Sequence, residues 1–266
     1  KIGINSKILV AKLTSNNVDF IGPSSTTEEI KYKIFESINR KLLNLEKKVN
    51  YDSNSYNFLQ NNILNKINDS KYDIINLHWI GNSFIKIKNL KKINKPIVWT
   101  LHDMWPYCGS EHYTISERYI EGYKKSNKSK NHKGLDIEKY CWNQKLKHYP
   151  YKMHVIAPSN WQYLNASNSK LFSDKNYNFK IHKIKLPLDF NFWKPIEKNY
   201  ARKILGLKEN LKIILIGSAD LNKKRKGYLD LNKILRQRSE LNNLKELVLL
   251  SFGKSELEFK QKYINF

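Results

Sequence analysis

The chain has 266 residues, of which 40% are hydrophobic and 12% aromatic, and this composition excludes wholesale disorder. No apolar run reaches the roughly 20 residues that a membrane-spanning helix needs, and no secretory signal peptide is visible. The two cysteines, Cys108 and Cys141, are too few for a disulfide framework and lack the paired spacing of a zinc site. We therefore expect a protein of the reducing cytoplasm.

The net charge of +24 permits binding of nucleic acid, anionic lipid or a polyphosphate ligand. The lysines are scattered, however, and are not interleaved with arginine and aromatic residues as in a nucleic-acid groove. Part of the excess positive charge reflects composition, because the chain is rich in Lys, Asn and Ile, the residues that an AT-rich genome favours. We therefore expect no nucleic-acid partner.

The first half of the chain shows the alternation of strands and helices that is typical of an α/β protein. Periodicity predicts, in chain order, a strand at 7–13, helices at 26–44 and 56–67, a strand at 72–79 and a strand that begins at Ile97. Thr26, Thr27 and Glu28 form a plausible cap for the first helix. This order predicts repeated βαβ units over a buried parallel sheet.

The second half loses the pattern at 113–151, where the polar stretch 124–133 predicts a mobile surface loop. Further elements are predicted beyond that loop: helices at 137–146, from about 160, at 201–205 and at 231–241, and strands at 154–157, 180–186, 212–216 and 247–252. The segment 187–195 is bracketed by prolines and predicts a crossing between domains. We therefore expect one domain at 1–186 and the start of a second at 196–266.

The segment 95–113, KPIVWTLHDMWPYCGSEHY, carries the strongest functional signal. Its apolar start predicts a buried strand, which leads directly into polar and aromatic residues: His102, Asp103, Trp105, Tyr107, Cys108 and His112. Open α/β sheets bind ligands beyond the carboxyl ends of their parallel strands. His102 is the first candidate for function, although a histidine beside a core strand can equally be a satisfied structural group.

Five blocks occur in a fixed order: DIINLHWI (73–80), KPIVWTLHDMWPYCG (95–109), VIAPSNW (155–161), PLDFNFWKP (187–195) and RKGY (225–228). This set resembles the bacterial glycosyltransferases of the GT-B fold, in the large retaining family 4. The resemblance covers almost the whole chain and is nearest to the branch that builds exopolysaccharide and lipopolysaccharide, such as the colanic acid transferases.

The resemblance implies an α/β protein of GT-B architecture, with one nearly complete Rossmann-like domain on the acceptor side and the start of a second that holds the donor. We expect a segment of a longer protein that lacks its first strand and glycine-rich turn, and also the paired glutamates of the donor domain. The implied reaction moves a hexosyl group from a nucleotide-sugar to a glycan or lipid-linked acceptor, without metal or cofactor. The implied location is the cytoplasm, with peripheral attachment to an anionic membrane surface as a further expectation.

By the same resemblance, Arg225 and Lys226 match a basic pair that clasps the donor diphosphate. Fixed cations there would stabilise the charge that develops on the leaving group, although a solvated basic turn would look the same. Gly217 and Ser218 are predicted to end the strand 212–216, where a residue without a side chain lets the main chain approach a phosphate or acceptor closely.

His102 matches the family histidine that lies beside the transferred sugar and hydrogen-bonds to it or to the departing phosphate. We assign it no role as a general base. Asp103 orients the imidazole or the acceptor, or simply caps the next turn. For other residues the structural alternative carries at least equal weight: core packing for Trp105, Tyr107, His78 and Trp79, and a helix cap for Ser159.

Close relatives tend to carry several cysteines and glycines after the HDMWP motif, whereas this chain has SEHYTISERYIEGY, so a stapled loop is not expected. Two other functions stay open. One is a metal-dependent hydrolase that uses His102, Asp103, Cys108 and His112. The other is a non-enzymatic basic module that binds nucleic acid or acidic polysaccharide. A Ser–His–Asp hydrolase is not supported, because no nucleophile-elbow sequence is present.

Overall fold

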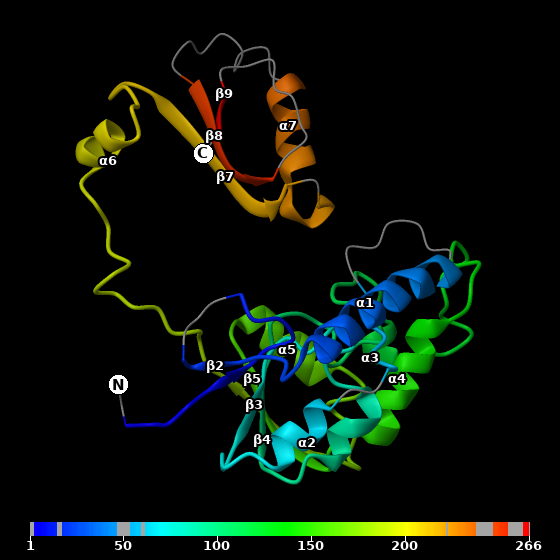
Figure 1. Cartoon of the computed structure of the whole chain (residues 1–266). Helices are drawn as coiled ribbons and strands as arrows, with labels where there is room; N and C mark the ends of the chain where they lie inside the picture. Colours follow the sequence, from blue (N-terminus) through cyan, green and yellow to red (C-terminus); the bar gives the residue numbers. More distant parts are fainter. Residues whose placement is uncertain are drawn as a thin grey trace. The chain divides into compact units, whose positions relative to one another are not determined.

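Figure 1 shows the computed structural model of the chain, which divides into two compact units, Lys1–Leu186 and Pro187–Phe266. The structure describes residues 3–14, 18–46, 54–59, 62–221, 223–237, 247–254 and 263–265. The division falls at the residue where the sequence predicts the end of the first domain. Both units combine helices with sheets of parallel strands, so the chain is an α/β protein of Rossmann-like character.

The first unit is built on a four-stranded sheet in the order β3-β4-β5-β6. The bounds of its strands are Ile75–Leu77 (β3), Ile97–Thr100 (β4), Lys152–Ala157 (β5) and Asn178–Lys183 (β6). All neighbours pair in parallel, and Trp99 stands in register with Leu77 on one side and Val155 on the other. These three side chains are buried in the main hydrophobic core. The carboxyl ends of the four strands therefore meet at one edge of the sheet.

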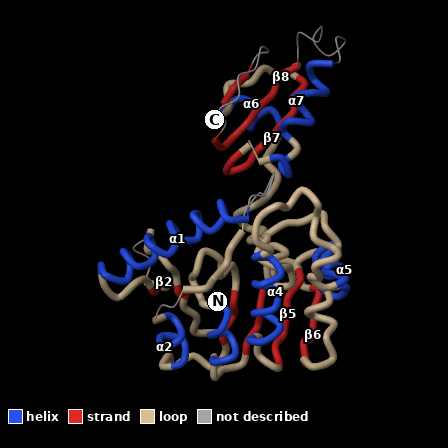
Figure 2. The backbone as a smooth tube through the Cα atoms, turned by 90° about the vertical axis from the view of Figure 1, so that its right-hand side faces the viewer, coloured by secondary structure: helices blue, strands red, loops and turns tan. Residues whose placement is uncertain are grey.

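The helices of the first unit differ widely in length. Their bounds are Thr26–Glu46 (α1), Ile63–Asn68 (α2), Ile87–Lys92 (the 3-10 helix η1), Arg118–Glu121 (α3), Ile137–His148 (α4) and Asn160–Asn168 (α5). Helix α4 packs against η1, and α5 packs against β5 and β6. Figure 2 shows α2, α4 and α5 beside this sheet. A separate pair of short parallel strands, β1 (Ile8–Leu9) and β2 (Phe20–Ile21), completes the described elements of the unit.

Helices α4 and α5 each begin after a residue whose side chain caps their first turn. Ser159 Oγ accepts a hydrogen bond from the backbone N–H of Gln162, and Asp136 accepts one from that of Lys139. Such caps satisfy backbone donors that have no partner inside the helix. The structural alternative for Ser159, a helix cap, is therefore confirmed.

The second unit carries a three-stranded parallel sheet in the order β7-β8-β9. Its elements are α6 (Lys198–Ile204), β7 (Lys212–Asp220), η2 (Lys224–Lys226), α7 (Tyr228–Gln237), β8 (Leu247–Lys254) and β9 (Tyr263–Asn265). A small core of Leu207, Val248 and Leu250 lies within it. The buried guanidinium of Arg202 donates to three backbone carbonyls after α6, which fixes the turn into β7.

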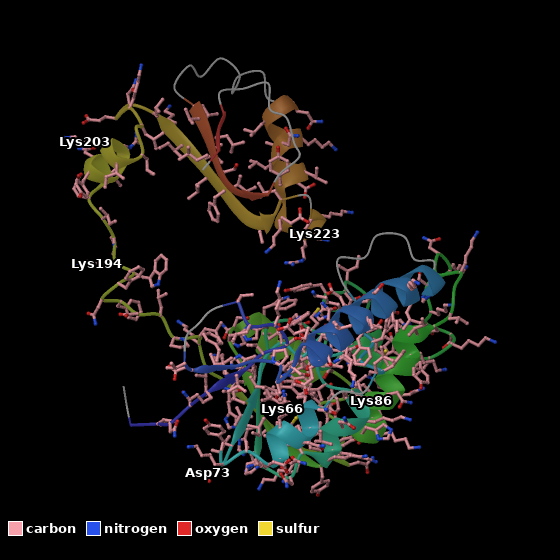
Figure 3. The ribbon with its side chains drawn as sticks, in the orientation of Figure 1. Lys66, Asp73, Lys86, Lys194, Lys203 and Lys223 are labelled. Carbon is pink, nitrogen blue, oxygen red and sulfur yellow. The ribbon has the colours of Figure 1, made fainter. Side chains whose placement is uncertain are left out.

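The lysines labelled in Figure 3 come from separate elements: Lys66 from α2, for example, and Lys203 from α6. Lys66 pairs with Glu28 at 2.7 Å, whereas Lys203 is exposed. The labelled part of the positive charge is therefore spread over different elements, as the sequence predicts. Among the described helices, none is long and apolar enough to cross a membrane.

The predicted helix at 56–67 is wrong in its first half, since α2 begins only at Ile63. Tyr56 and Asn57 lie instead in a buried loop, where Asn57 has a positive φ of 50°. The Asn57 side chain donates to the carbonyls of Ile80 and Ile85 and accepts from the N–H of Ser83. These contacts with residues far along the chain override the local helical pattern.

Other predicted bounds also change. The strand predicted at 7–13 is only two residues long, and the strand predicted at 72–79 shrinks to β3. The strand predicted to end at 216 continues to Asp220, while the last residues of the helix predicted at 231–241 lie outside the described residues. Strands β2 and β9 were not predicted, since each is too short to leave a periodic pattern.

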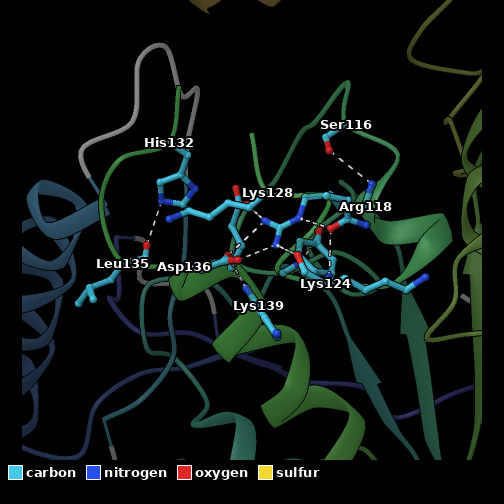
Figure 4. Close-up of polar contacts among 12 residues, drawn as sticks. Ser116, Arg118, Lys124, Lys128, His132, Leu135, Asp136 and Lys139 are labelled. Atoms are coloured by element: carbon cyan, nitrogen blue, oxygen red, sulfur yellow. Dashed lines mark hydrogen bonds and ion pairs between the residues drawn. The ribbon is translucent and has the colours of Figure 1, made fainter. Parts of the chain in front are cut away.

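The polar stretch 124–133 forms no helix or strand, as predicted, but it is anchored at several points. Figure 4 shows the guanidinium of Arg118 facing the carboxylate of Asp136. Arg118 is buried, and its Nη2 lies 2.7 Å from Asp136 Oδ2. The same guanidinium contacts Glu138 at 2.7 Å and donates to the side chain of Asn127. Arg118 therefore ties this stretch to the start of α4.

Candidate functional site

A small pocket lies in the first unit at the carboxyl ends of β3 and β4. Its polar and aromatic lining includes His78, Trp79, His102, Asp103, Trp105 and His112. His78 directly follows β3 and His102 follows β4, and these two strands are neighbours in parallel. The pocket therefore occupies the edge at which open α/β sheets bind ligands.

The two histidines after β3 and β4 contact each other. His78 Nδ1 lies 2.8 Å from His102 Nε2, and both side chains are exposed. Their ring centroids are 5.1 Å apart. Desolvation lowers the pKa of His78, and the neighbouring His102 adds to this shift. The sequence analysis favoured a structural role for His78, but the structure places this residue beside the leading candidate.

Asp103 binds an imidazole, but it is that of His112 rather than that of His102. Its Oδ2 lies 2.6 Å from His112 Nδ1, and its Oδ1 accepts from the backbone N–H of Trp105 at 3.0 Å. The side chains of Asp103 and His112 are both buried. The bond from the N–H of Trp105 to Asp103 caps the turn after β4, which is one of the two roles predicted for Asp103. Asp103 therefore holds the loop after β4 in place beside His102.

A serine extends this pair into a chain of three side chains. Ser55 Oγ lies 2.7 Å from His112 Nε2, which repeats the Ser–His–Asp order of many hydrolases. Ser55 is fully buried, however, and its Oγ accepts from the backbone N–H of Asn82. A nucleophile must reach its substrate. We therefore interpret the chain as a structural network that joins residues 55, 82, 103 and 112.

A buried lysine on α4 binds the same loop after β4. Lys145 Nζ donates to the backbone carbonyls of Trp105, Cys108 and Gly109, and it lies 3.7 Å from the centroid of the Trp105 ring. Burial lowers the pKa of Lys145 to about 8. Together with Asp103, it fixes the course of the chain between Trp105 and Gly109.

Trp105 and Tyr107 are core residues. Trp105 is 2% exposed and Tyr107 is 0% exposed, so neither presents a free face to a sugar. Tyr107 packs against Tyr119 and Phe172, and Trp105 stacks on His112. Trp105 and Tyr107 therefore have the core-packing role that the sequence left open for them.

Gly217 and Ser218 lie inside β7 instead of at its end. A side chain at Gly217 would meet the ring of Phe252 at 1.9 Å, so the glycine makes room for a neighbour on β8. Ser218 Oγ accepts weakly from the N–H of Asp220. Within its own unit, the glycine thus has a packing reason that the sequence analysis did not foresee.

Arg225 and Lys226 lie on η2, which follows β7 and precedes α7. Both side chains are exposed. Helix η2 ends at Gly227, whose φ of 72° is in the left-handed region that glycine adopts without strain. The turn therefore presents its two cations beyond the carboxyl end of a parallel strand.

The residues proposed for a metal-dependent hydrolase do not gather around a common point in the described part of the chain. His102 contacts His78, while Asp103 and His112 bind each other. Cys108 is fully buried, and burial raises the pKa of its thiol, which disfavours the thiolate that binds metals. Among the described residues, a group with metal-binding side chains does occur at His132, Asp136 and Glu138. There Arg118 already pairs with both carboxylates (Figure 4).

Comparison with protein-family models and with curated proteins finds no match for this chain. The structure therefore defines a class, an α/β protein with parallel sheets and Rossmann-like character. It also defines a pocket at the strand ends of the first unit. His102 and Asp103, which the sequence motifs indicate, both line this pocket. Ser55 and Lys145 carry no such signal in the sequence, because their partners lie 57 and 36 to 40 residues away along the chain.

Proposed function

We propose that this chain is part of a metal-independent, retaining glycosyltransferase of GT-B architecture. It would move a hexosyl group from a nucleotide-sugar to a glycan or lipid-linked acceptor during cell-surface polysaccharide synthesis. One observation supports the proposal: each unit has polar residues, selected from the sequence motifs, that follow a parallel strand. His102 follows β4, and Arg225 and Lys226 follow β7. Ligands of open α/β sheets bind at this position.

In this proposal the first unit serves the acceptor side and the second unit the donor side. His102 orients the donor sugar or its phosphate by a hydrogen bond, which needs an accessible ring nitrogen. The exposure of His102 supports that role. Arg225 and Lys226 stabilise the negative charge that develops on the diphosphate as the sugar leaves. A guanidinium offers a planar fork of donors and an ammonium a movable point charge, a suitable combination for two phosphates.

The acceptor and the location are also part of the proposal. A net charge of +24 favours contact with anionic lipid headgroups, so the enzyme would work in the cytoplasm at the inner face of the membrane. Flotation of the protein with anionic vesicles tests this part separately. Recovery of all protein at the bottom of the gradient would remove the membrane contact from the proposal.

Binding of nucleoside diphosphates is the first experiment. We expect at least one of UDP, GDP, ADP or dTDP to raise the melting temperature of the full-length protein that contains this chain, because a ligand that binds only the folded state stabilises it. The sugar nucleotide of that base should then donate its hexose to a membrane extract when the full-length protein is assayed. If no nucleoside diphosphate binds, the proposal is wrong. Tight, salt-sensitive binding of random RNA in its place would support the basic binding module.

A further inference from the structure

Exposed lysines gather near the amino ends of β4 and β5, whereas the pocket lies at the carboxyl ends. The 3-10 helix η1, which precedes β4, buries Ile87 and Leu90 on one side. Residues three apart on such a helix lie over one another, so Lys88 and Lys91 share a neighbouring side, and both are exposed. Lys92 ends the helix and is exposed as well. Helix η1 therefore presents three ammonium groups to solvent.

Helix α4 adds a fourth lysine to this group. It packs against η1 and ends at His148, shortly before β5 begins. Lys147 is exposed, whereas the neighbouring His148 is buried. Burial lowers the pKa of His148, and the positive charges of four lysines lower it further. Since the interaction between charges weakens with distance, these lysines gather around one imidazole. We call them the lysine cluster: Lys88, Lys91, Lys92 and Lys147.

The lysine cluster lies in parts of the chain that are poor in carboxylates. No aspartate or glutamate occurs between residues 74 and 102 or between residues 139 and 173. The end of α2 approaches η1, where the Asn68 side chain donates to the carbonyl of Lys92, and Asp69 follows Asn68. Within the described part of the chain, however, no carboxylate forms an ion pair with the lysine cluster. The four ammonium groups are therefore available to an external anion.

The exposure of the lysine cluster distinguishes between anionic partners. A small ligand is bound in a concave site with convergent polar groups. The four lysines are instead exposed on two packed elements, and none of them lines the pocket. Such an array suits an extended anionic surface, because each lysine near a membrane of anionic lipids raises the binding constant by about fivefold. Contact at the amino ends of the strands also leaves the pocket at the carboxyl ends uncovered.

We propose that the lysine cluster is the surface through which the first unit binds a membrane of anionic phospholipids. The ammonium groups contact the phosphates of several lipids at once. The contact is electrostatic and stays in the headgroup region, because η1 keeps its apolar side chains Ile87 and Leu90 in the core. This inference rests on the membrane contact in the proposed function and assigns that contact to four residues.

Lysine reactivity maps the contact in the full-length protein that contains this chain. The protein is briefly acetylated with vesicles of phosphatidylcholine and phosphatidylglycerol, or with vesicles of phosphatidylcholine alone, and mass spectrometry measures the acetylation of each lysine. We expect the anionic vesicles to slow acetylation of the lysine cluster several-fold and to leave Lys130 and Lys133 unchanged. Vesicles of phosphatidylcholine alone should protect none of these lysines. Equal protection of all of them would overturn the proposal, as would protection by inorganic polyphosphate but not by anionic vesicles.

A matched pair of variants tests the same contact by charge. The cluster variant combines Lys88→Gln, Lys91→Gln, Lys92→Gln and Lys147→Gln. The control variant changes four exposed lysines of the stretch 124–133 and combines Lys124→Gln, Lys125→Gln, Lys130→Gln and Lys133→Gln. Both variants lose four charges from the net charge of +24. In flotation with the anionic vesicles at fixed salt, the cluster variant should bind at least about 10²-fold more weakly than the natural protein, and the control variant should bind within about threefold of it.

The pKa of His148 tests the geometry of the lysine cluster without any membrane. Because the lysines disfavour the imidazolium, the pKa of His148 should rise in the cluster variant and stay unchanged in the control variant. Nuclear magnetic resonance titration measures both values. An unchanged pKa in the cluster variant would show that the lysines do not surround His148 and would overturn the proposal.

The outcomes of flotation separate this inference from the proposed function. If the natural protein does not float, the membrane contact of the proposed function fails, and the lysine cluster fails with it. If the natural protein floats and the two variants bind equally, only the lysine cluster is refuted, because net charge or another surface then sets the affinity. Binding of nucleoside diphosphates is measured without vesicles, so the transferase proposal is tested independently.

Discussion

The loop after β4 (residues 101–112) and the η2 turn after β7 (residues 223–227) both follow parallel strands, and sequence motifs selected both. The loop after β4 is held by distant residues: Lys145 binds three of its carbonyls, and Ser55 contacts its His112. The η2 turn closes on a local bond between Lys226 and Lys223 and exposes its cations. In the first region, the residues that hold the loop are therefore different from His102, the exposed candidate for ligand contact. In the second region the exposed cations themselves are the candidates.

Lys145→Met should have the largest effect on stability. Three backbone carbonyls would lose a charged donor in a fully buried place, and we expect the free energy of unfolding to fall by about 3–5 kcal/mol. Chemical denaturation of the chain measures it. Lys147→Met is the matched control, because this exposed lysine lies on the same helix and should cost less than about 0.5 kcal/mol. Equal effects of the two substitutions would mean that the loop after β4 is not held from α4.

Asp103→Asn should destabilise the first unit by about 2 kcal/mol. The change keeps the shape of the side chain and removes the charge that binds His112. Denaturation followed by tryptophan fluorescence is suitable, because Trp105 stacks on His112. The exposed Asp73 supplies the control, since Asp73→Asn should leave stability unchanged. A stable Asp103→Asn chain would contradict the interpretation of the Ser55–His112–Asp103 chain as a structural network.

The pH dependence of stability should reveal Lys145 as well. Its pKa is lowered to about 8 in the folded state, against 10.5 as the ordinary value. Between these values the unfolded chain keeps a proton that the folded chain has released, so the contribution of Lys145 to stability rises with pH. The difference between the natural chain and Lys145→Met should therefore grow by at most about 1.4 kcal/mol per pH unit above about pH 8. A constant difference would show that Lys145 stays protonated in its buried site.

His102→Ala should separate function from stability. His102 is exposed, so the free energy of unfolding should change by less than about 0.5 kcal/mol. In the full-length protein, transfer of hexose should fall by about 10²-fold, because an oriented hydrogen bond to the donor would be lost. His154→Ala is the control: His154 lies in β5 and does not line the pocket, so this variant should keep the turnover of the natural protein. Near-normal turnover in His102→Ala would refute the role proposed for this residue.

Arg225→Ala and Lys226→Ala should have the smallest effect on stability, since both side chains are exposed on the η2 turn. We expect each to weaken nucleoside diphosphate binding by about tenfold, as expected for the loss of a charge-assisted hydrogen bond. Calorimetry on the full-length protein at fixed salt measures this affinity. Lys203→Ala on α6 is the control, because it removes the same charge from another exposed position of the second unit. Equal affinities in all three variants would exclude η2 from the donor site.

Local patterns were sufficient for much of the fold. The apolar runs at Ile97 and at 212–216 each predicted a strand, and the proline-bracketed segment 187–195 predicted the point where the two units divide. These signals depend on side-chain periodicity and on backbone restriction over a few residues. The helix predicted at 56–67 failed at Asn57, where side-chain bonds to residues more than 20 positions away outweigh local preference.

The sequence by itself determined that polar groups follow β4, because a strand and the residues after it are neighbours along the chain. Only the tertiary structure decided which of these groups are accessible and which are buried supports. From the sequence, Lys145 cannot be distinguished from an exposed lysine of α4, and His78 cannot be distinguished from a structural residue beside a core strand. Their contacts depend on how α4 lies against the loop after β4 and how β3 pairs with β4, and packing between distant segments leaves no signature in the spacing of residues in one chain.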